Sequence, residues 1–159
     1  STIFSRVAKG NNQKNVRPVE PNIVKTSPMK WTLSEDLGRK YTAVSGDFNP
    51  IHIDQQFAKN SPFNSTIAHG LMIAASISHM LSETFGISWA NSGQLSLRFR
   101  NPVLQGDSIS TFGQIENIVC QNEFVEIDCN VGVKKNNGQD AITGQAKIIY
   151  PIERGAKLE

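Results

Sequence analysis

Residues 67–81 form a nearly unbroken run of apolar and small side chains, Ile-Ala-His-Gly-Leu-Met-Ile-Ala-Ala-Ser-Ile-Ser-His-Met-Leu. In a helix of this sequence such residues occupy nearly the whole circumference, so the helix must be buried on most of its sides. Gly86 is a suitable residue to end it. A chain of 159 residues fits one domain, and that domain needs a second layer that wraps around the helix.

The second half of the chain has the period of strands. Leu95, Leu97 and Phe99 alternate with polar residues, as in a strand with one buried face. Further strands are expected at about 108–119, 123–134 and 141–150, because turn residues separate them. We expect these strands to form an antiparallel meander. The predicted fold is therefore α+β, with a curved antiparallel sheet wrapped around one long central helix.

The first half contains shorter elements. A strand is expected near residues 23–31, followed by a helix that Ser34 caps and that carries Leu37, Tyr41 and Val44 on one face. Residues 1–23 are polar and contain two prolines, which predicts an extended leader or linker. The domain is then expected over 24–152, and a tail over 153–159, with vector-derived residues at its end as an open alternative.

Composition excludes several classes of function. A net charge of +2 is too small to indicate a nucleic-acid or membrane partner. A hairpin turn at 121–122 places Cys129 opposite about Gln114, roughly 20 Å along the strand from Cys120, which is too far for a disulfide. The sequence has no membrane-spanning apolar run and no glycine-rich nucleotide-binding motif, and its first residues lack the continuous apolar stretch expected of a signal peptide. We therefore expect a cytoplasmic protein that needs no nucleotide cofactor.

Residues 45–53, Ser-Gly-Asp-Phe-Asn-Pro-Ile-His-Ile, are expected to form a structured loop that carries the chemistry. Gly46 permits unusual backbone geometry, and Pro50 stiffens the connection between Asp47 and His52. A carboxylate and an imidazole aimed into one space can activate a water molecule near neutral pH. Asn49 is expected to brace this loop by hydrogen bonding to the backbone.

Gly70 is expected at the start of the central helix, where a backbone N–H has no partner within the helix and can bind a developing oxyanion. Two nearby residues have structural interpretations, Asp54 as a helix cap and His69 as a partner of backbone groups. A metal site is not expected. A calcium loop that starts at Asp47 has His52 where glycine is required, and no zinc motif is present.

The segment 45–54, together with Ala58, resembles the hydratase signature of the MaoC-like, (R)-specific enoyl-CoA hydratases, which have the hot-dog fold. Residues 67–71 resemble the start of their central helix, and the likeness extends from about Trp31 to Pro151. The resemblance implies a hydro-lyase of fatty acid metabolism. Such an enzyme adds water to trans-2-enoyl-CoA to give the (3R)-3-hydroxyacyl-CoA, or catalyses the reverse dehydration.

The resemblance also assigns roles to individual residues. Asp47 and His52 would activate water and move the proton to C2, Gly70 would polarise the thioester carbonyl through its amide, and Asn49 would brace the catalytic loop. The substrate would be a thioester of coenzyme A or of acyl carrier protein, so coenzyme A enters as part of the substrate and not as a cofactor. A homodimer is implied as well.

Alternatives remain open on the sequence alone. The chain can be a hot-dog acyl-CoA thioesterase, or a non-catalytic acyl-thioester-binding module of a larger protein, since the leader resembles a linker in longer relatives. Arg98 and Arg100 are the candidates for binding the phosphates of coenzyme A. Phosphates could also be bound by Lys134, Lys135 and Lys147. For any single one of these basic residues, the alternative is that it lies on a solvent-exposed strand face and binds nothing.

Overall fold

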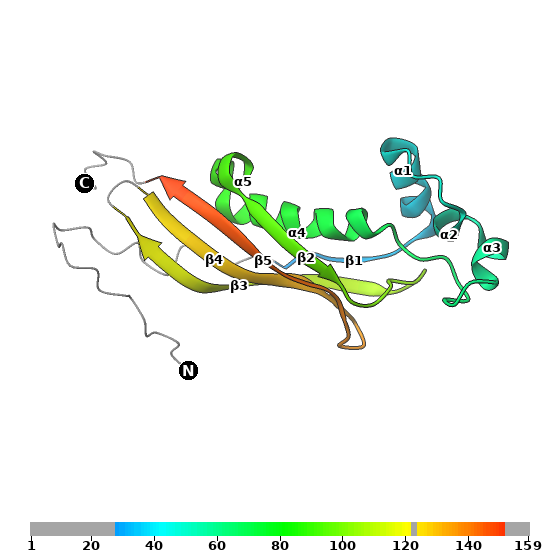
Figure 1. Ribbon diagram of the computed structural model, residues 1–159. Coiled ribbons are helices and arrows are strands. Elements are labelled where there is room, and N and C mark those ends of the chain that lie inside the picture. The colour runs from blue at the N-terminus through cyan, green and yellow to red at the C-terminus, as the bar shows by residue number, and fades with distance from the viewer. Residues whose placement is uncertain (1–27, 122–123, 152–159) are drawn as a thin grey trace.

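A computed structural model describes residues 28–121 and 124–151. The long helix α4 (Gly70–Phe85) lies along one face of a curved sheet (Figure 1). The other elements are β1 (Lys30–Thr32), α1 (Glu35–Ser45), α2 (Pro50–Ile53), α3 (Gln55–Lys59), α5 (Ile87–Ser92), β2 (Gln94–Phe99), β3 (Ser108–Cys120), β4 (Phe124–Lys135) and β5 (Asp140–Pro151). The leader predicted at 1–23 and the tail predicted at 153–159 lie outside the described residues. The α+β class and the sheet around a central helix agree with the expectation.

The antiparallel sheet has the strand order β1-β3-β4-β5-β2. Strands β3, β4 and β5 form the expected meander, but the prediction that β2 continues it is wrong. β2 pairs with β5, with Leu95 opposite Ala146, and β3 pairs with β1 on its other side. Ser92 at the end of α5 holds this arrangement, because its hydroxyl donates to Ile149 O and accepts from Ile149 N. The chain therefore enters β2 beside β5.

The core lies between α4 and the sheet face that it covers. Ile77, Met80 and Leu81 of α4 are all fully buried, and so are Val131 and Val133 of β4. The helix begins at Gly70, three residues after the apolar run begins, because Ile67 instead forms a bridge with Leu104. These contacts fix the N-terminal end of α4 relative to the sheet.

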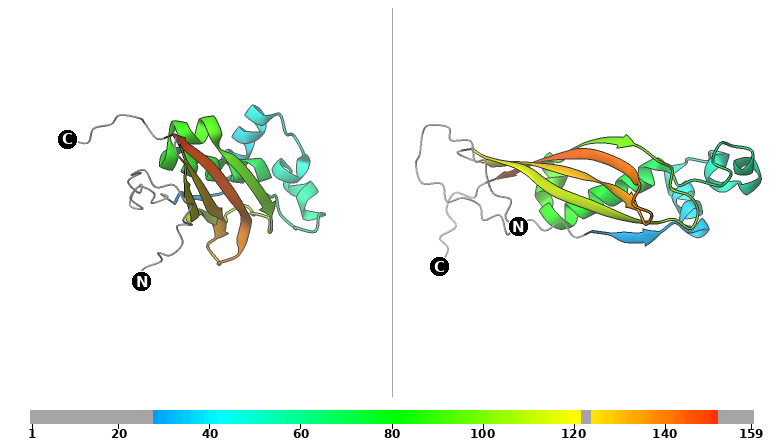
Figure 2. Two further views of the ribbon diagram at one scale, coloured as in Figure 1. Left: turned by 60° about the vertical axis from the view of Figure 1, so that its left-hand side comes forward. Right: turned by 90° about the horizontal axis from the view of Figure 1, so that it is seen from below.

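Helices α1, α2 and α3 gather beyond the end of the sheet at which α4 begins (Figures 1 and 2). Ser34 and Asp54 cap α1 and α3 as expected, through bonds of 3.2 Å to Leu37 N and of 2.8 Å to Gln56 N. The expectation that Val44 belongs to the buried apolar face of α1 is wrong, since Val44 is 84% exposed. The buried residues of α1 are the small Gly38 and Thr42, because this side of the helix approaches the site closely.

Two further observations bear on the sequence expectations. Cys120 and Cys129 are free, and Cys129 lies opposite Ile115, one residue from the predicted partner Gln114. Burial, with the charges of Asp128 and Glu116, raises the pKa of the Cys129 thiol to about 11, so it stays protonated. Among the helices of the described residues, none has the length and apolar content required to cross a membrane.

The pairing of β2 with β5 predicts the effect of a mutation at Gly144. A Cβ at this position would lie 2.2 Å from Ser96 O and 2.6 Å from Leu97 Cδ2. Because backbone atoms of β2 cannot move aside without separating the strands, Gly144→Ala should lower the free energy of unfolding by about 1–3 kcal/mol. Gln145→Ala, at the next and exposed position, should change it by less than about 0.5 kcal/mol. Urea unfolding followed by circular dichroism measures both, and equal midpoints would contradict the close approach of β2 and β5.

Candidate active site

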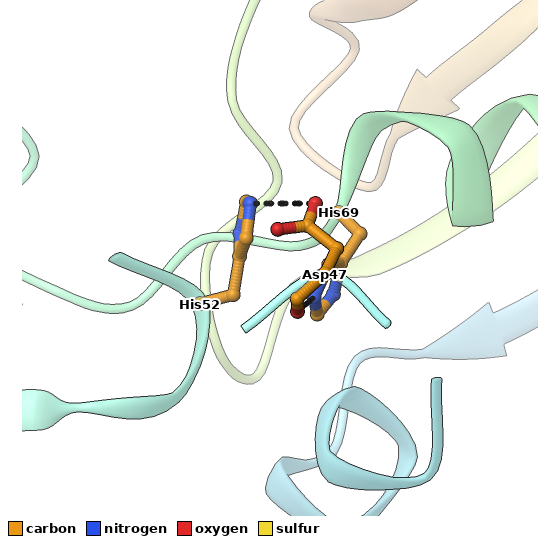
Figure 3. A group of neighbouring side chains, drawn as sticks. All are labelled: Asp47, His52 and His69. Atoms are coloured by element: carbon orange, nitrogen blue, oxygen red, sulfur yellow. Dashed lines mark hydrogen bonds and ion pairs between the residues drawn. The ribbon is translucent and has the colours of Figure 1, made fainter. Parts of the chain in front are cut away.

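Asp47, His52 and His69 meet at the point where α4 begins (Figure 3). Asp47 lies in the link between α1 and α2, His52 lies in α2, and His69 precedes the first residue of α4. The Asp47 side chain is 51% exposed, whereas that of His52 is 12% exposed. The carboxylate thus faces solvent, while the imidazole is held inside the protein.

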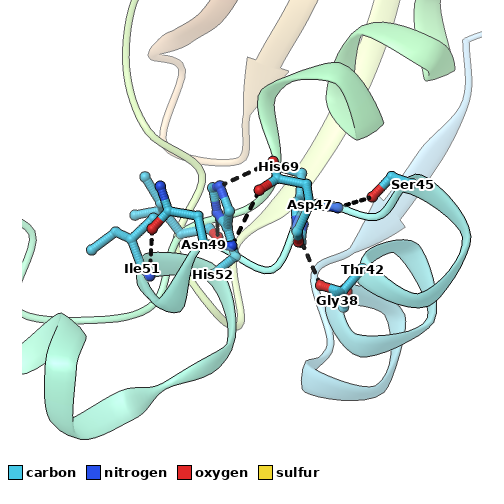
Figure 4. Close-up of polar contacts among 9 residues, drawn as sticks. Gly38, Thr42, Ser45, Asp47, Asn49, Ile51, His52 and His69 are labelled. Carbon is cyan, nitrogen blue, oxygen red and sulfur yellow. Dashed lines mark hydrogen bonds and ion pairs between the residues drawn. The ribbon is translucent and has the colours of Figure 1, made fainter.

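The backbone between Ser45 and Ile51 is fixed by short-range hydrogen bonds (Figure 4). Gly46 ends α1 in the left-handed conformation with φ 73°, which glycine adopts readily. The carboxylate of Asp47 accepts from Asn49 N at 3.2 Å, and the amide oxygen of Asn49 accepts from Ile51 N at 3.1 Å. Asn49 therefore caps α2, a helical turn that starts at Pro50, in a segment that the sequence predicted as a loop. His52 is presented by this turn.

The tautomer of His52 follows from its surroundings. Its Nδ1 lies 2.9 Å from Ile67 O, and a carbonyl oxygen only accepts, so Nδ1 carries the proton. In the neutral ring, Nε2 then holds a free lone pair. Nε2 lies 3.9 Å from Asp47 Oδ2, which is too long for a direct hydrogen bond and suits one bridging water molecule.

His69 connects Asp47 to α1. Its Nε2 lies 3.2 Å from Asp47 O and 3.1 Å from Thr42 Oγ1. The Thr42 hydroxyl donates to Gly38 O, so both oxygens near His69 accept, and His69 Nε2–H donates to them. This is the role of partner to backbone groups that the sequence suggested. It holds the backbone at Asp47 at a fixed distance from α1.

His69 is also kept uncharged. Burial lowers its pKa below the ordinary 6.5, and a charge on His52 would lower it further, while the bond to Asp47 O acts in the opposite direction. Within the described part of the chain, His69 Nδ1 is buried without a hydrogen-bond partner. The rings of His52 and His69 stack with centroids 4.0 Å apart, so two positive charges here would repel strongly. The site is built to hold one charged imidazole at most.

One donor atom each of Asp47, His52 and His69 lie within 4.8 Å of one another, so a metal ion has to be considered. The lone pairs of an imidazole lie in the plane of its ring. Because the two rings are stacked at 28°, their lone pairs do not converge on one point. His69 Nε2 is also engaged in hydrogen bonds. This geometry favours a water molecule over a metal ion, and a metal-independent site stays our prediction.

A pocket of about 330 Å³ opens beside this group. It is lined by Tyr41, Ser45, Asp47, His69, Gly70, Leu71 and Phe99. Gly70 is the first residue of α4, so its N–H has no carbonyl partner within the helix and lies at the positive end of the helix dipole. A Cβ at Gly70 would approach the Phe99 ring to 3.0 Å. Glycine therefore lets the Phe99 ring pack directly against the start of α4, in the wall of the pocket.

A larger hollow of about 510 Å³ lies across β2, β3, β4 and β5. Its charged lining residues are Glu116, Asp128 and Lys147, and Lys147 Nζ is paired with Glu126 at 2.5 Å. None of its lining residues is a histidine. The pocket next to Asp47 and Gly70 is therefore the better candidate for catalysis, although it is smaller.

Comparison with known families decides the affiliation of the chain. The family model described as MaoC like domain matches residues 14–138, a range that includes Asp47, His52 and Gly70. The chain belongs to the MaoC-like domain family. The match begins inside the segment assigned to the leader, whose boundary stays a prediction.

Individual MaoC-like relatives agree with this affiliation. An (R)-specific enoyl-CoA hydratase of Rhodospirillum rubrum is 29% identical over 120 residues, which cover 76% of this chain and 81% of that protein. A mitochondrial 3-hydroxyacyl-(acyl-carrier-protein) dehydratase of Arabidopsis thaliana is 30% identical over 122 residues, which cover 74% of this chain and 70% of that protein. The R-hydratase PhaJ1 of Pseudomonas aeruginosa superimposes with a TM-score of 0.67 at 26% identity, over 84% of this chain and 86% of that one. The predicted hot-dog fold is thereby confirmed.

The MaoC-like domain does not bring every candidate residue to the pocket. Arg98 is exposed and, by strand alternation, points to the face of β2 opposite Phe99. Arg100 Nε donates to Thr143 Oγ1 at 2.9 Å. Neither arginine lines the pocket. Lys135 cannot meet a phosphate in solvent, because it is buried in an ion pair with Asp107.

Sequence reasoning missed the pocket residues Tyr41, Leu71 and Phe99 of this MaoC-like domain. Phe99 was expected only as the last apolar residue of a strand. Its position at the strand end, close to Gly70 in space, requires the pairing of β2 with β5 and the start of α4 to be known. A clearer sequence signal was available for Leu71, which directly follows Gly70 in a helix.

The lowered pKa of His69 predicts a pH dependence of stability. The unfolded state, with a pKa near the ordinary 6.5, binds more protons than the folded state below that pH. Stability should therefore fall as the pH drops from about 6.5 toward the lowered pKa. His69→Gln keeps an N–H donor but cannot titrate, so its melting temperature should fall less between about pH 7.5 and about pH 5 than that of the wild type. Parallel curves for the two proteins would show that His69 is not held neutral.

Proposed function

We propose that this chain adds water to trans-2-enoyl thioesters to give (3R)-3-hydroxyacyl thioesters, or catalyses the reverse dehydration. One observation carries the proposal. The proton on His52 Nδ1 is committed to Ile67 O, which leaves the Nε2 lone pair facing Asp47 Oδ2 across 3.9 Å, beside the free amide of Gly70. The names of the relatives, an enoyl-CoA hydratase and a hydroxyacyl dehydratase, support the same hydro-lyase chemistry.

The gap between Asp47 and His52 is the proposed place of the reacting water. Asp47 Oδ2 and His52 Nε2 both accept, so a water between them donates to each and turns an oxygen lone pair toward the substrate. As its oxygen bonds to C3, the water gives one proton to the pair. The electrons of the C2–C3 double bond move toward the thioester carbonyl, and the proton then passes from the pair to C2. Asp47 and His52 end in their starting states.

The second half of the proposed mechanism stabilises the enolate. Negative charge develops on the thioester oxygen as water adds, and a backbone N–H at a helix start is well placed to receive it. Gly70 N–H has this position, and Gly70 lines the pocket that would receive the thioester. Since water and proton both come from Asp47 and His52, they reach the same face of the double bond, which gives syn addition.

The carrier of the acyl group is proposed to be coenzyme A or acyl carrier protein. Arg98 and Arg100 lie outside the pocket lining and are exposed, Arg98 near the end of β2 and Arg100 just after it. Their cations suit the phosphates of a long carrier that extends out of the pocket. A cytoplasmic location and the absence of a nucleic-acid partner stay predictions.

We further propose a homodimer. Four exposed apolar residues form what we call the apolar rim, because they line the pocket or adjoin its lining residues in the chain: Val44, Phe48, Leu71 and Phe99. Their exposed fractions are 84%, 66%, 71% and 57%, and exposure to this extent is unfavourable for large apolar side chains in water. A second copy of the chain would cover them and enclose the thioester.

Removal of the acid/base pair should abolish hydration. Asp47→Asn and His52→Gln keep the size of each side chain and remove its proton chemistry, so each should lower kcat/KM for crotonyl-CoA by about 10²- to 10⁴-fold. Loss of the enone absorbance measures the reaction. Asp54→Asn is the matched control, because it removes a nearby carboxylate while asparagine still caps α3.

The same experiments distinguish hydration from the two alternative functions, thioester hydrolysis and acyl-thioester binding without catalysis. Full activity in both variants would exclude the mechanism. Release of free thiol, detected with a thiol reagent, would indicate thioester hydrolysis in place of hydration. Binding of acyl-CoA without turnover at any chain length would indicate a non-catalytic module.

The dimer proposal predicts a mass of twice 17.5 kDa by light scattering. Val44→Lys places a charge in the apolar rim and should shift the protein toward the monomer. Ile87→Lys is the control, since Ile87 is 73% exposed but lies at the opposite end of α4. If both substitutions shifted the protein toward the monomer equally, or if neither did, the contact between the two copies would lie outside the apolar rim.

A further inference from the structure

Lys135 and Asp107 form a buried ion pair outside the pocket lining. Lys135 Nζ lies 2.7 Å from Asp107 Oδ2 and 3.2 Å from Pro102 O. The two side chains are only 7% and 21% exposed. Asp107 Oδ2 also accepts from Leu104 N at 2.8 Å. Both charged groups are therefore bonded to the backbone of the segment between β2 and β3, residues 100–107, which we call the β2–β3 link.

The β2–β3 link supports residues 66–68 through backbone hydrogen bonds. Ala68 N donates to Val103 O at 2.8 Å, and Gln105 N donates to Thr66 O at 3.3 Å. Between them, Ile67 and Leu104 form an isolated antiparallel bridge. A shift of the link would therefore move residues 66–68 with it.

Residues 66–68 in turn position both halves of the active site. Ile67 O accepts the proton of His52 Nδ1 at 2.9 Å, and Ile67 N donates to Ile51 O at 3.2 Å. On the other side, His69 and Gly70 follow directly in the chain. The hydrogen bond that sets the tautomer of His52 thus depends on a carbonyl that the β2–β3 link holds in place.

We propose that Lys135 is a positioning residue of the hydration reaction, which acts through Asp107 and residues 66–68 to keep His52 Nδ1 protonated and Nε2 free. The kinetic consequences rest on the proposed function, whereas the tautomer of His52 can be observed without any activity. Lys135 touches neither the pocket nor the reacting groups. Its three ammonium donors satisfy two oxygens of the link at once, which an apolar side chain of equal volume cannot do.

The test removes the ion pair without leaving a buried charge unpaired. Lys135→Met combined with Asp107→Asn is neutral at both positions, and the introduced amide oxygen can still accept from Leu104 N. Nitrogen-15 spectra of the histidine side chains should show His52 with Nδ1 protonated in the wild type and a mixture of tautomers in the double variant. For crotonyl-CoA hydration, kcat should fall by about 10- to 100-fold, with KM changed less than about twofold.

A matched control lies one residue away. Lys134 and Asp140 form an ion pair of 2.6 Å whose side chains are 50% and 40% exposed, on the outer face of the sheet. Lys134→Met with Asp140→Asn should leave both the tautomer and kcat unchanged. If the buried double variant does not fold, Asp107→Asn alone weakens the same pair and should give the same changes with smaller amplitude.

The possible results separate the two proposals. A single Nδ1-protonated tautomer of His52 in the folded double variant, or in Asp107→Asn, would overturn the positioning role of Lys135. An equal change in the control pair would also overturn it. Absence of hydration by the wild type would count against the proposed function, and the spectra would still decide the role of Lys135.

Discussion

Burial of α4 against the curved sheet is the interaction on which the rest of the structure depends. Ile77, Met80 and Leu81 are fully removed from water, and such side chains each stabilise a fold by about 1.5–3 kcal/mol. This contact fixes the axis of the helix and therefore the direction in which its first amide points. The proposed oxyanion side of the site is thus set by the core. The proposed acid/base side, Asp47 and His52, has no such anchor of its own and must be attached to the start of α4.

That attachment consists of two hydrogen bonds between side chains and backbone oxygens, made by residues that precede the helix start. His69 bonds to Asp47 O, and His52 bonds to Ile67 O, so residues 67 and 69, just before Gly70, hold both members of the proposed acid/base pair. Each bond also selects a tautomer, since both acceptors are carbonyl oxygens. The arrangement explains why two histidines stand face to face with different roles. One, His69, is buried and neutral and maintains the distances, while the other, His52, presents a lone pair to Asp47 Oδ2.

Much of this was predictable from the sequence, and the exceptions have physical causes. The apolar run identified α4, and period-two alternation identified the strands, because each signal is local in the chain. The spacing of Asp47, Pro50 and His52 likewise predicted that the side chains of Asp47 and His52 lie close together. The partner of β2 was not predictable, since pairing depends on α5 and Ser92. Neither was the burial of Lys135, because its partner Asp107 lies in a distant segment. The exposure of Val44 was misjudged because apolar character was taken to mark the buried face.

Helices α1, α2 and α3 bury only a small face, and this determines which part of the protein opens first on warming. Only Gly38, Thr42 and Ala58 of these helices are fully buried, and the partly buried Leu37 and Tyr41 add the remaining core contacts. Segments with few buried apolar groups open at lower free energies than the core. On warming, the acid/base pair would therefore come apart while the sheet and α4 remain folded. Heat inactivation would precede the loss of secondary structure and would reverse on cooling.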